Sequence, residues 1–237
     1  MNLSSKIFNQ EQIVYEDNHI VVVNKLAGQI VQGDKTGDVP LSELIKDFIK
    51  KRDNKPGNVF CGVIHRIDRP VSGLVIFAKT SKALSRFNEL VRERKIQKSY
   101  LAVVKNKPAA EQGILKHWLI KNEKTNTSKA FSKPTPNALE SCLEYKYLGS
   151  SSTYHLLKIN LITGRHHQIR CQLGSIGCSI KGDLKYGAER SNPGGFIHLH
   201  SAELSFIHPI KNEPIHLFCF PISDDPVWNF FKTNLKQ

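Results

Sequence analysis

Long apolar runs are missing from this sequence of 237 residues. No stretch approaches the roughly 20 apolar residues that a helix needs to cross a bilayer. The first six residues also lack the charged region and the following apolar region of a secretory signal. These absences argue against a membrane-spanning or exported protein, and we expect a cytoplasmic one.

Cysteines are few and scattered. The five are an odd number, and no two of them form a Cys-x-x-Cys pair. This pattern argues against both a disulfide framework and a zinc ribbon, and free, buried thiols in a reducing compartment account for it simply. The five are Cys61, Cys142, Cys171, Cys178 and Cys219.

Histidine is the more plentiful potential metal ligand, with ten residues. The closest pairs are His198 with His200 and His166 with His167. Two histidines separated by one residue on a strand face the same side. No carboxylate or thiol stands beside them at a recognisable ligand spacing. We therefore expect no metal site, and we keep a metal-dependent hydrolase as an alternative.

Basic residues dominate the charge. The formal net charge is +13 and the isoelectric point is near 9.5, so the protein attracts polyanions. Residues 92–133 hold eleven Lys or Arg against three Glu, a net charge of +8. No basic amphipathic helix with bulky apolar residues opposite is visible, which argues against a membrane surface. A nucleic-acid backbone is the expected partner, and a solvated lysine-rich face is the alternative.

Short strands and a few helices alternate without a regular βα repeat. Strands are predicted within 13–25, where an Asp-Asn turn separates two of them, and at 98–104, 141–147, 154–161, 196–206 and 215–220. One helix is predicted from the apolar spacing that begins at Leu41, with Pro40 placed to start it. Further helices are predicted from a cap at Ser81, from near Gly164, and from Asp225 as cap with Pro226 as first residue.

Residues 121–137 are polar and interrupted by proline, which predicts a long exposed loop or extended excursion whose lysines suit phosphates. No repeat or linker divides the chain. We expect one α+β domain over residues 1–237, with a largely antiparallel mixed sheet flanked by helices.

One carboxylate stands out because it is held between cations. Asp68 lies between Arg66 and Arg69 and is followed by Pro70 and an apolar strand. A nearby positive charge favours the ionised form of a carboxyl group, so Asp68 can act as a nucleophile or a base. The alternative is an aspartate that caps a turn beside two solvated arginines.

Residues 65–79 resemble the active-site motif of the RluA family of pseudouridine synthases, with Ile67 where the family has Leu. Further resemblances follow in the family's order at residues 25–28, 98–104, 163–187 and 199–209. Departures from the family pattern are Leu26 for Pro, His166 for Thr, Cys178-Ser179 for His-Pro, and Ser201 in the last motif.

The resemblance implies the pseudouridine synthase catalytic fold with a central RNA-binding cleft. It also implies isomerisation of uridine to pseudouridine without a cofactor. Asp68 matches the family's catalytic Asp, and Arg170 the basic residue that pairs with it. Tyr100 matches the tyrosine that stacks against the target base. A non-catalytic RNA-binding protein of this fold is the alternative.

A base inside a helix must be flipped out before it can react. Arg66 is expected either to fill the space that the base leaves or to clamp a phosphate, with His65 and Arg69 as further RNA contacts. Arg165 and Lys25 are expected to bind the RNA backbone or to be structural.

Two questions about the reaction stay open at this point. Asp68 could attack C1′, attack the base or remove the C2′ proton, and the substrate could be ribosomal RNA, transfer RNA or both. The motifs begin close to Met1, so no separate N-terminal RNA-binding domain is expected. We also expect a monomer.

Overall fold

The computed structural model describes residues 7–34 and 36–235, which divide into two compact units. The first unit holds the described residues up to Gln97 together with Ser201–Ile222. The second holds Lys98–His200 and the described residues from Ser223 onward. Residues 1–6, in which we expected no secretory signal, lie outside the described residues. The expectation of one catalytic domain stays a prediction.

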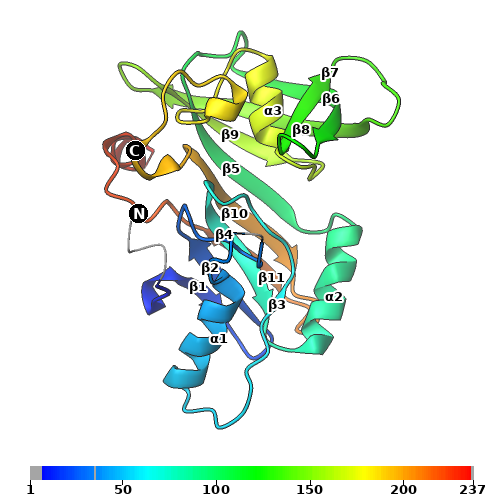
Figure 1. Cartoon of the computed structure of the whole chain (residues 1–237), viewed down its shortest axis with the longest axis vertical. Helices are drawn as coiled ribbons and strands as arrows, with labels where there is room; N and C mark the ends of the chain where they lie inside the picture. Colours follow the sequence, from blue (N-terminus) through cyan, green and yellow to red (C-terminus); the bar gives the residue numbers. More distant parts are fainter. Residues whose placement is uncertain (1–6, 35, 236–237) are drawn as a thin grey trace. The chain divides into compact units, whose positions relative to one another are not determined.

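The first unit is built on a sheet in which every register described is antiparallel, and the direction of the pair formed by its last two strands is not among them (Figure 1). Its strand order is β1 (Ile13–Glu16), β2 (Ile20–Lys25), β4 (Ser72–Ala78) and residues 201–207 of β10 (Leu199–Ile207). Strand β3 (Gly62–Val63) pairs with β4, and β11 (Pro214–Phe218) pairs with β10. The predicted turn between β1 and β2 is confirmed, because Asp17 Oδ1 accepts from the amides of His19 (2.7 Å) and Ile20 (2.8 Å).

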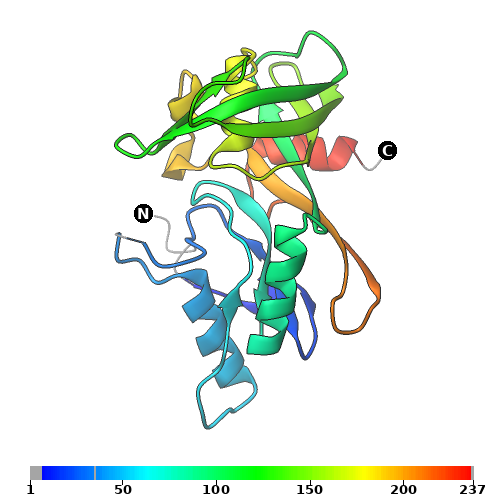
Figure 2. The same ribbon diagram turned by 90° about the vertical axis from the view of Figure 1, so that its right-hand side faces the viewer.

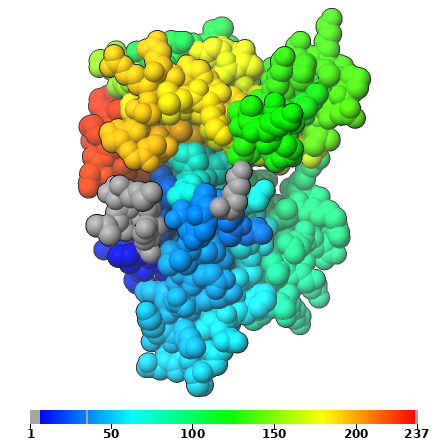
Figure 3. Space-filling view, viewed as in Figure 1, coloured from blue at the N-terminus to red at the C-terminus, as the bar shows by residue number. Residues whose placement is uncertain are grey.

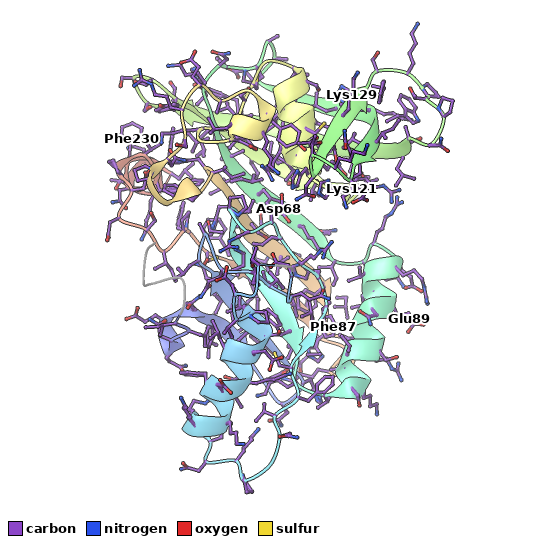
Figure 4. The ribbon with its side chains drawn as sticks, viewed as in Figure 1. Asp68, Phe87, Glu89, Lys121, Lys129 and Phe230 are labelled. Atoms are coloured by element: carbon purple, nitrogen blue, oxygen red, sulfur yellow. The ribbon has the colours of Figure 1, made fainter. Side chains whose placement is uncertain are left out.

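The core of the first unit forms where two wholly buried strands meet a helix. All residues of β2 and β4 are buried, as their continuous apolar runs require. Helix α2 (Ser81–Arg92) places Ala83 and Phe87 in this core, whereas Glu89 points outward (Figure 4). Helix α1 (Leu41–Arg52) buries Ile45 and Ile49 through the same periodicity. A short 3-10 helix, η2 (Gln10–Gln12), precedes β1.

Two predicted helix starts are corrected by one residue each. Thr80, and not Ser81, caps α2, because its hydroxyl accepts from the amide of Ala83 at 3.1 Å. Pro40 is the residue before the first turn of α1 rather than the first helical residue. At α2 both Thr80 and Ser81 have a hydroxyl that could cap, and the extended backbone of Thr80 selects it; at α1 Pro40 has extended backbone and makes no side-chain cap.

The second unit carries the remaining strands, and every register described in it is antiparallel (Figure 2). The order is β5 (Gln97–Val104), β9 (His155–Leu161), β8 (Leu139–Ser150), β6 (Gln112–Asn122) and β7 (Thr127–Phe131). Helix α3 (Gln168–Ser175) packs against β6 and β7. The other elements are η3 (Leu184–Tyr186), η4 (Pro193–Gly195) and α4 (Pro226–Asn234).

The predicted long loop at 121–137 is wrong in its first half, which forms a β-hairpin of β6 and β7. Lys121 pairs with Ser128 and Asn122 with Thr127, so only four residues turn at the tip. The alternation of side chains in β7 was hidden because it is an edge strand with one face in water, where lysine replaces the apolar residues of a core strand.

Helix α3 begins four residues later than the start predicted near Gly164. His167 has a left-handed backbone (φ 50°), which a helix interior does not allow. The Gln168 side chain holds the preceding turn, because its Oε1 accepts from the Thr163 hydroxyl at 2.8 Å and the Arg165 amide at 3.0 Å. The start of α4 is as predicted, with Asp225 as cap and Pro226 as first residue.

Several expected absences concern the described residues. No helix among them is long and apolar enough to cross a membrane. The five cysteines are free thiols, buried or half-buried. Burial raises the pKa of Cys61 and of Cys219 to about 12, which makes both thiols poor nucleophiles.

Among the described residues no three His, Cys, Asp or Glu side chains gather as a metal site would need. The expectation of no metal stays a prediction for a chelator to test.

Replacing Gly73 by alanine should destabilise the protein by about 3 kcal/mol or more. Gly73 has φ 117°, and a Cβ there would lie well inside van der Waals contact with the backbone of Ser201. Urea denaturation measures the loss. Gly57→Ala is the matched control, because nothing lies within 4 Å of its added Cβ. Equal stability of the two variants would contradict this account of Gly73.

Candidate active site

Asp68 lies in the loop that joins β3 to β4. Its backbone carbonyl accepts from the amide of Val71 at 3.0 Å, which closes a turn with Arg69 and Pro70 at its centre. Asp68 is half-buried and the preceding Ile67 is buried. Ser72 and Gly73, which follow this turn, are the first residues of β4. The turn therefore fixes Asp68 itself (Figure 4).

The loop is tied to the segment after β2 through the carbonyl of Arg69. That oxygen accepts from the amide of Gly28 at 2.8 Å and from the ammonium of Lys25 at 3.2 Å. The same ammonium donates to the carbonyls of Leu26 (3.0 Å) and Gln29 (2.8 Å). Lys25 is wholly buried, so these contacts support the structural alternative for this residue.

Burial sets the electrostatics of Lys25. Loss of water lowers the pKa of its ammonium to about 7, the charge of Asp68 acts in the opposite direction, and Arg69 lowers it further. An ammonium that is dry and bonded to backbone carbonyls is a rigid anchor, because moving it would leave buried polar groups unpaired.

Three further residues of the motif were predicted to contact RNA. His65 is buried, and its Nε2 accepts from the amide of Ile76 at 3.2 Å, which ties the loop to β4. Arg69 is exposed and forms an ion pair with Asp38 at 2.5 Å. Arg66 is exposed. Arg66 is thus the member of the three best placed to meet an external partner, and the RNA contacts of all three stay predictions.

Arg170 is the third residue of α3 and is clamped by a carboxylate. Its Nε donates to Asp183 Oδ2 at 2.7 Å and its Nη2 to Asp183 Oδ1 at 2.8 Å. The two side chains are only 5% and 1% exposed. The sequence resemblance included Asp183 without giving it a role. The signal that could have found it is the need of a buried arginine for a buried acceptor.

Tyr186 connects Arg170 to β7. The guanidinium carbon of Arg170 lies 5.2 Å from the centre of the Tyr186 ring, a cation–π contact. The Tyr186 hydroxyl accepts from the amide of Ser128 at 2.7 Å and is hydrogen-bonded to His167 Nδ1 at 2.9 Å. Burial raises the pKa of Tyr186 to about 12, so the phenol stays neutral at physiological pH.

His166, one of the departures from the family pattern, ties the loop before α3 to the same hairpin. Its Nδ1 is hydrogen-bonded to the Ser128 hydroxyl at 2.9 Å and its Nε2 to Asn126 Oδ1 at 3.0 Å. Its ring stacks on His167 with 3.8 Å between the centres. Arg165 makes a local contact as well, because its Nε donates to the carbonyl of Glu140 at 3.2 Å.

Tyr100 is buried in β5 and lies on the face of the sheet that α3 covers. Tyr100 pairs with Ile159, which pairs with Tyr145, which pairs with Gly113. Residues two apart along β6 share a face, and His117 of that set is bonded to Gln172 of α3. The second unit therefore places Tyr100 on the side of its sheet that also carries α3 with Arg170. Asp68 belongs to the first unit, so its predicted pairing with Arg170 stays a prediction.

Comparison with known proteins identifies the family. The family model described as RNA pseudouridylate synthase matches residues 19–175, which include Asp68, Tyr100 and Arg170. Ribosomal large subunit pseudouridine synthase C of Rickettsia bellii is 32% identical over 209 residues, covering 86% of this chain and 67% of the relative. The tRNA pseudouridine synthase C of Haemophilus influenzae is 31% identical over 222 residues, covering 86% of this chain and 90% of the relative.

Solved structures agree on the fold. Human RNA Pseudouridylate Synthase Domain Containing 4 superimposes with a TM-score of 0.75 and 21% identity, covering 95% of this chain and 93% of that chain. The chain belongs to the RNA pseudouridylate synthase family, whose members are isomerases that convert uridine in RNA to pseudouridine. The predicted α+β fold and RluA-type function are confirmed. The chain spans about two thirds of the ribosomal synthases that it matches.

The buried ammonium of Lys25 should make stability depend on pH. Its pKa falls from 10.5 in the unfolded chain to about 7 in the folded one. Between these values the unfolded chain binds more protons, so the free energy of unfolding rises with pH, by at most about 1.4 kcal/mol per pH unit. Below about pH 7 Lys25 is protonated in both the folded and the unfolded chain. Its contribution to the free energy of unfolding is then constant and at its least favourable value.

Urea denaturation from about pH 6 to about pH 10 tests this. Wild type should gain stability relative to Lys25→Met as the pH rises. Lys55→Met, at a side chain 45% exposed, should show a constant difference from wild type. A constant difference for Lys25→Met would mean that the carbonyls keep the ammonium charged, contrary to the lowered pKa.

Proposed function

We propose that the carboxylate of Asp68 performs the isomerisation and that the substrates are ribosomal RNA, transfer RNA or both. The observation that carries the role of Asp68 is the anchored turn, in which the carbonyls of Asp68 and Arg69 are both bonded to backbone or buried donors. A half-buried carboxylate on such a turn has a fixed position, and catalysis requires a fixed position.

The reaction itself explains why one carboxylate is enough. The N1–C1′ bond breaks, the uracil turns, and a C5–C1′ bond forms, so substrate and product contain the same atoms and no electrons are exchanged with a cofactor. Asp68 could attack C1′, attack the base or remove the C2′ proton. In each role the carboxylate must be ionised and must stand beside the ribose.

Arg170 is proposed as the residue that orients Asp68 and stabilises its charge. Asp183 binds the Nε and Nη2 edge of the guanidinium, so the proposed contact with Asp68 falls to Nη1 and the outer Nη2 hydrogen. Because the guanidinium is planar and its one edge is clamped, its other edge points in one direction. Asp183 is therefore proposed as a positioning residue for Arg170.

The target base is proposed to stack on Tyr100 after flipping, at an unstacking cost of a few kcal/mol. Arg66 is proposed to fill the vacated space or to hold a phosphate, in keeping with its exposure. His65, Arg69, Arg165 and Lys25 are proposed to support the site, the last through its carbonyl contacts.

The RNA class rests on the names of the relatives. Those named for ribosomal RNA and those named for transfer RNA are equally similar, near 30% identity. The chain covers 87–90% of the transfer RNA synthases and 65–72% of ribosomal synthases C. We propose a monomer that acts in the cytoplasm; sedimentation and fractionation of cells test these two points.

Asp68→Asn should abolish product formation and leave RNA affinity within about twofold, because the amide keeps the shape of the carboxylate but cannot react or accept a proton. The substrate is bulk RNA from cells that lack this gene, and new pseudouridines are mapped by carbodiimide modification. Asp47→Asn, at an exposed residue of α1, is the control and should keep full activity. Pseudouridine made by Asp68→Asn would rule out the proposed role.

Asp183→Asn should lower kcat by about tenfold to a hundredfold with little change in KM, since a small displacement of a catalytic partner has an effect of this size. It should also destabilise the fold by about 3 kcal/mol, because Arg170 keeps a buried charge with a weaker partner. Asp183→Glu should recover part of kcat, and Glu189→Gln, at an exposed carboxylate, should behave as wild type. A loss of stability with unchanged kcat of the folded enzyme would show that Asp183 is only structural.

A further inference from the structure

One face of the second unit's sheet carries aromatic and basic side chains. Gln172 of α3 donates to the carbonyl of Leu115 and bonds His117, so His117 lies on the α3 side of β6. Side chains alternate along a strand, and Trp118 therefore lies on the opposite side. We call this opposite side the outer face. In Figure 2 the strands of this unit lie in front of α3.

The register shows which residues share the outer face. Trp118 pairs with Phe131, and Ile120 pairs with Lys129. Along β6 the same side carries Lys116 and Ile114, and Ile114 is 65% exposed. Farther across the sheet the outer face continues with Glu140, Cys142, Glu144, Lys146, Lys158 and Asn160.

The aromatic pair stands among cations. Lys116 Nζ lies 5.7 Å from the centre of the Trp118 ring, and Lys129 Nζ lies 5.2 Å from that of Phe131. Trp118 and Phe131 are half-buried, so part of each ring remains open to solvent. Figure 3 shows side chains of the β6–β7 hairpin at the molecular surface. Exposed rings with ammonium groups beside them suit a ligand that has both planar bases and phosphates.

The charge of the outer face favours the same ligand. Lys146 and Lys158 stand directly opposite each other on β8 and β9. Two lysines in this position bring two positive charges to the same part of the face, which suits a polyanion. Four lysines share the face with two glutamates, and one of these, Glu140, already forms an ion pair with Lys116 at 3.3 Å. The excess is positive.

The size of the face suits more than one nucleotide. Trp118 and Gln112 are six residues apart on β6, and Gln112 is level with Lys146. The aromatic pair and the lysine pair are thus separated by about 20 Å along the strands. This surface is also distinct from the candidate active site, because Tyr100 and Arg170 belong to the α3 side of the sheet.

We propose that the outer face binds an unpaired RNA strand, with bases stacked on Trp118 and Phe131 and phosphates held by Lys116, Lys129, Lys146 and Lys158. Paired bases are hidden from such rings, so the strand must be single. The surface would hold a segment of the substrate outside the reacting uridine. This inference rests on the proposed function only in taking RNA as the partner.

The test uses an RNA of about ten adenosines and cytidines, a length typical of single-strand sites. It contains no uridine, so isomerisation does not intervene. The protein has two tryptophans, and Trp228 is only 4% exposed, so Trp118 reports on the surface. The RNA should quench tryptophan emission of the full chain. Trp118→Leu should lose this quenching and bind labelled RNA at least about fivefold more weakly.

Controls separate stacking from folding and from charge. Trp118→Phe keeps a ring and should retain most of the affinity without the emission signal. Phe230→Leu removes an aromatic side chain that is 42% exposed on α4 and should bind as wild type (Figure 4). Thermal unfolding followed by circular dichroism establishes that each variant is folded.

Two results would overturn the proposal. One is unchanged affinity of folded Trp118→Leu, which would make the aromatic pair a stabiliser of the hairpin alone. The other is equally tight, Trp118-independent binding of the same RNA paired to a DNA complement, which would leave only phosphate attraction. Neither result would contradict the proposed reaction, because the pseudouridine assay with bulk RNA measures the reaction separately.

Discussion

The carbonyl oxygen of Arg69 holds the structure around Asp68 together. Two donors meet on it, the amide of Gly28 and the ammonium of Lys25, and both come from the segment that follows β2. The contact joins two parts of the chain more than forty residues apart. The loop before β4 is otherwise fixed by its own turn and by the bond between His65 and the amide of Ile76. The wholly buried β2 and β4 supply the rigid base on which this tie rests.

Among the described residues each unit has one buried lysine or arginine, Lys25 in the first and Arg170 in the second, and the chemistry of the two burials differs. Lys25 is surrounded by carbonyls and has no carboxylate bonded to its ammonium among the contacts described, so desolvation acts strongly on its pKa. Arg170 keeps its charge at any relevant pH and has the bidentate carboxylate of Asp183. An ammonium bonded to carbonyls serves to hold backbone in place. A clamped guanidinium can present its second edge to another group, as a partner of a catalytic carboxylate must.

Much of this fold could be predicted from the sequence because its elements obey local rules. The apolar runs of β2 and β4 and the helical spacing of Ala83 and Phe87 are unambiguous, and Asp225-Pro226 marks a helix start. The hairpin of β6 and β7 could not be predicted in the same way, because an edge strand with lysines on its open face lacks the apolar alternation of a core strand.

The site could be predicted only as far as local motifs reach. Asp68, Tyr100 and Arg170 are visible because short runs around them resemble the family. Asp183 and Tyr186 act on Arg170 through contacts between segments, and no local pattern marks such contacts. Likewise, Lys25 could be recognised as a position of interest, but its burial among carbonyls is a consequence of how β2 meets the loop before β4.

The hairpin links the two sides of the second unit's sheet. On the α3 side, the amide of Ser128 in β7 donates to the hydroxyl of Tyr186, whose ring lies under Arg170. The next residue, Lys129, belongs to the outer face and stands over Phe131. A strand only five residues long therefore has one side bonded to the supports of Arg170 and the other side open to solvent. Because a strand moves as a unit with its ladder, a ligand held on the outer face would stiffen the same backbone that carries the Tyr186 contact. Lysines on the open side of β7 suit an edge strand that meets water, because an exposed hydrophobic edge is prone to pair with other chains.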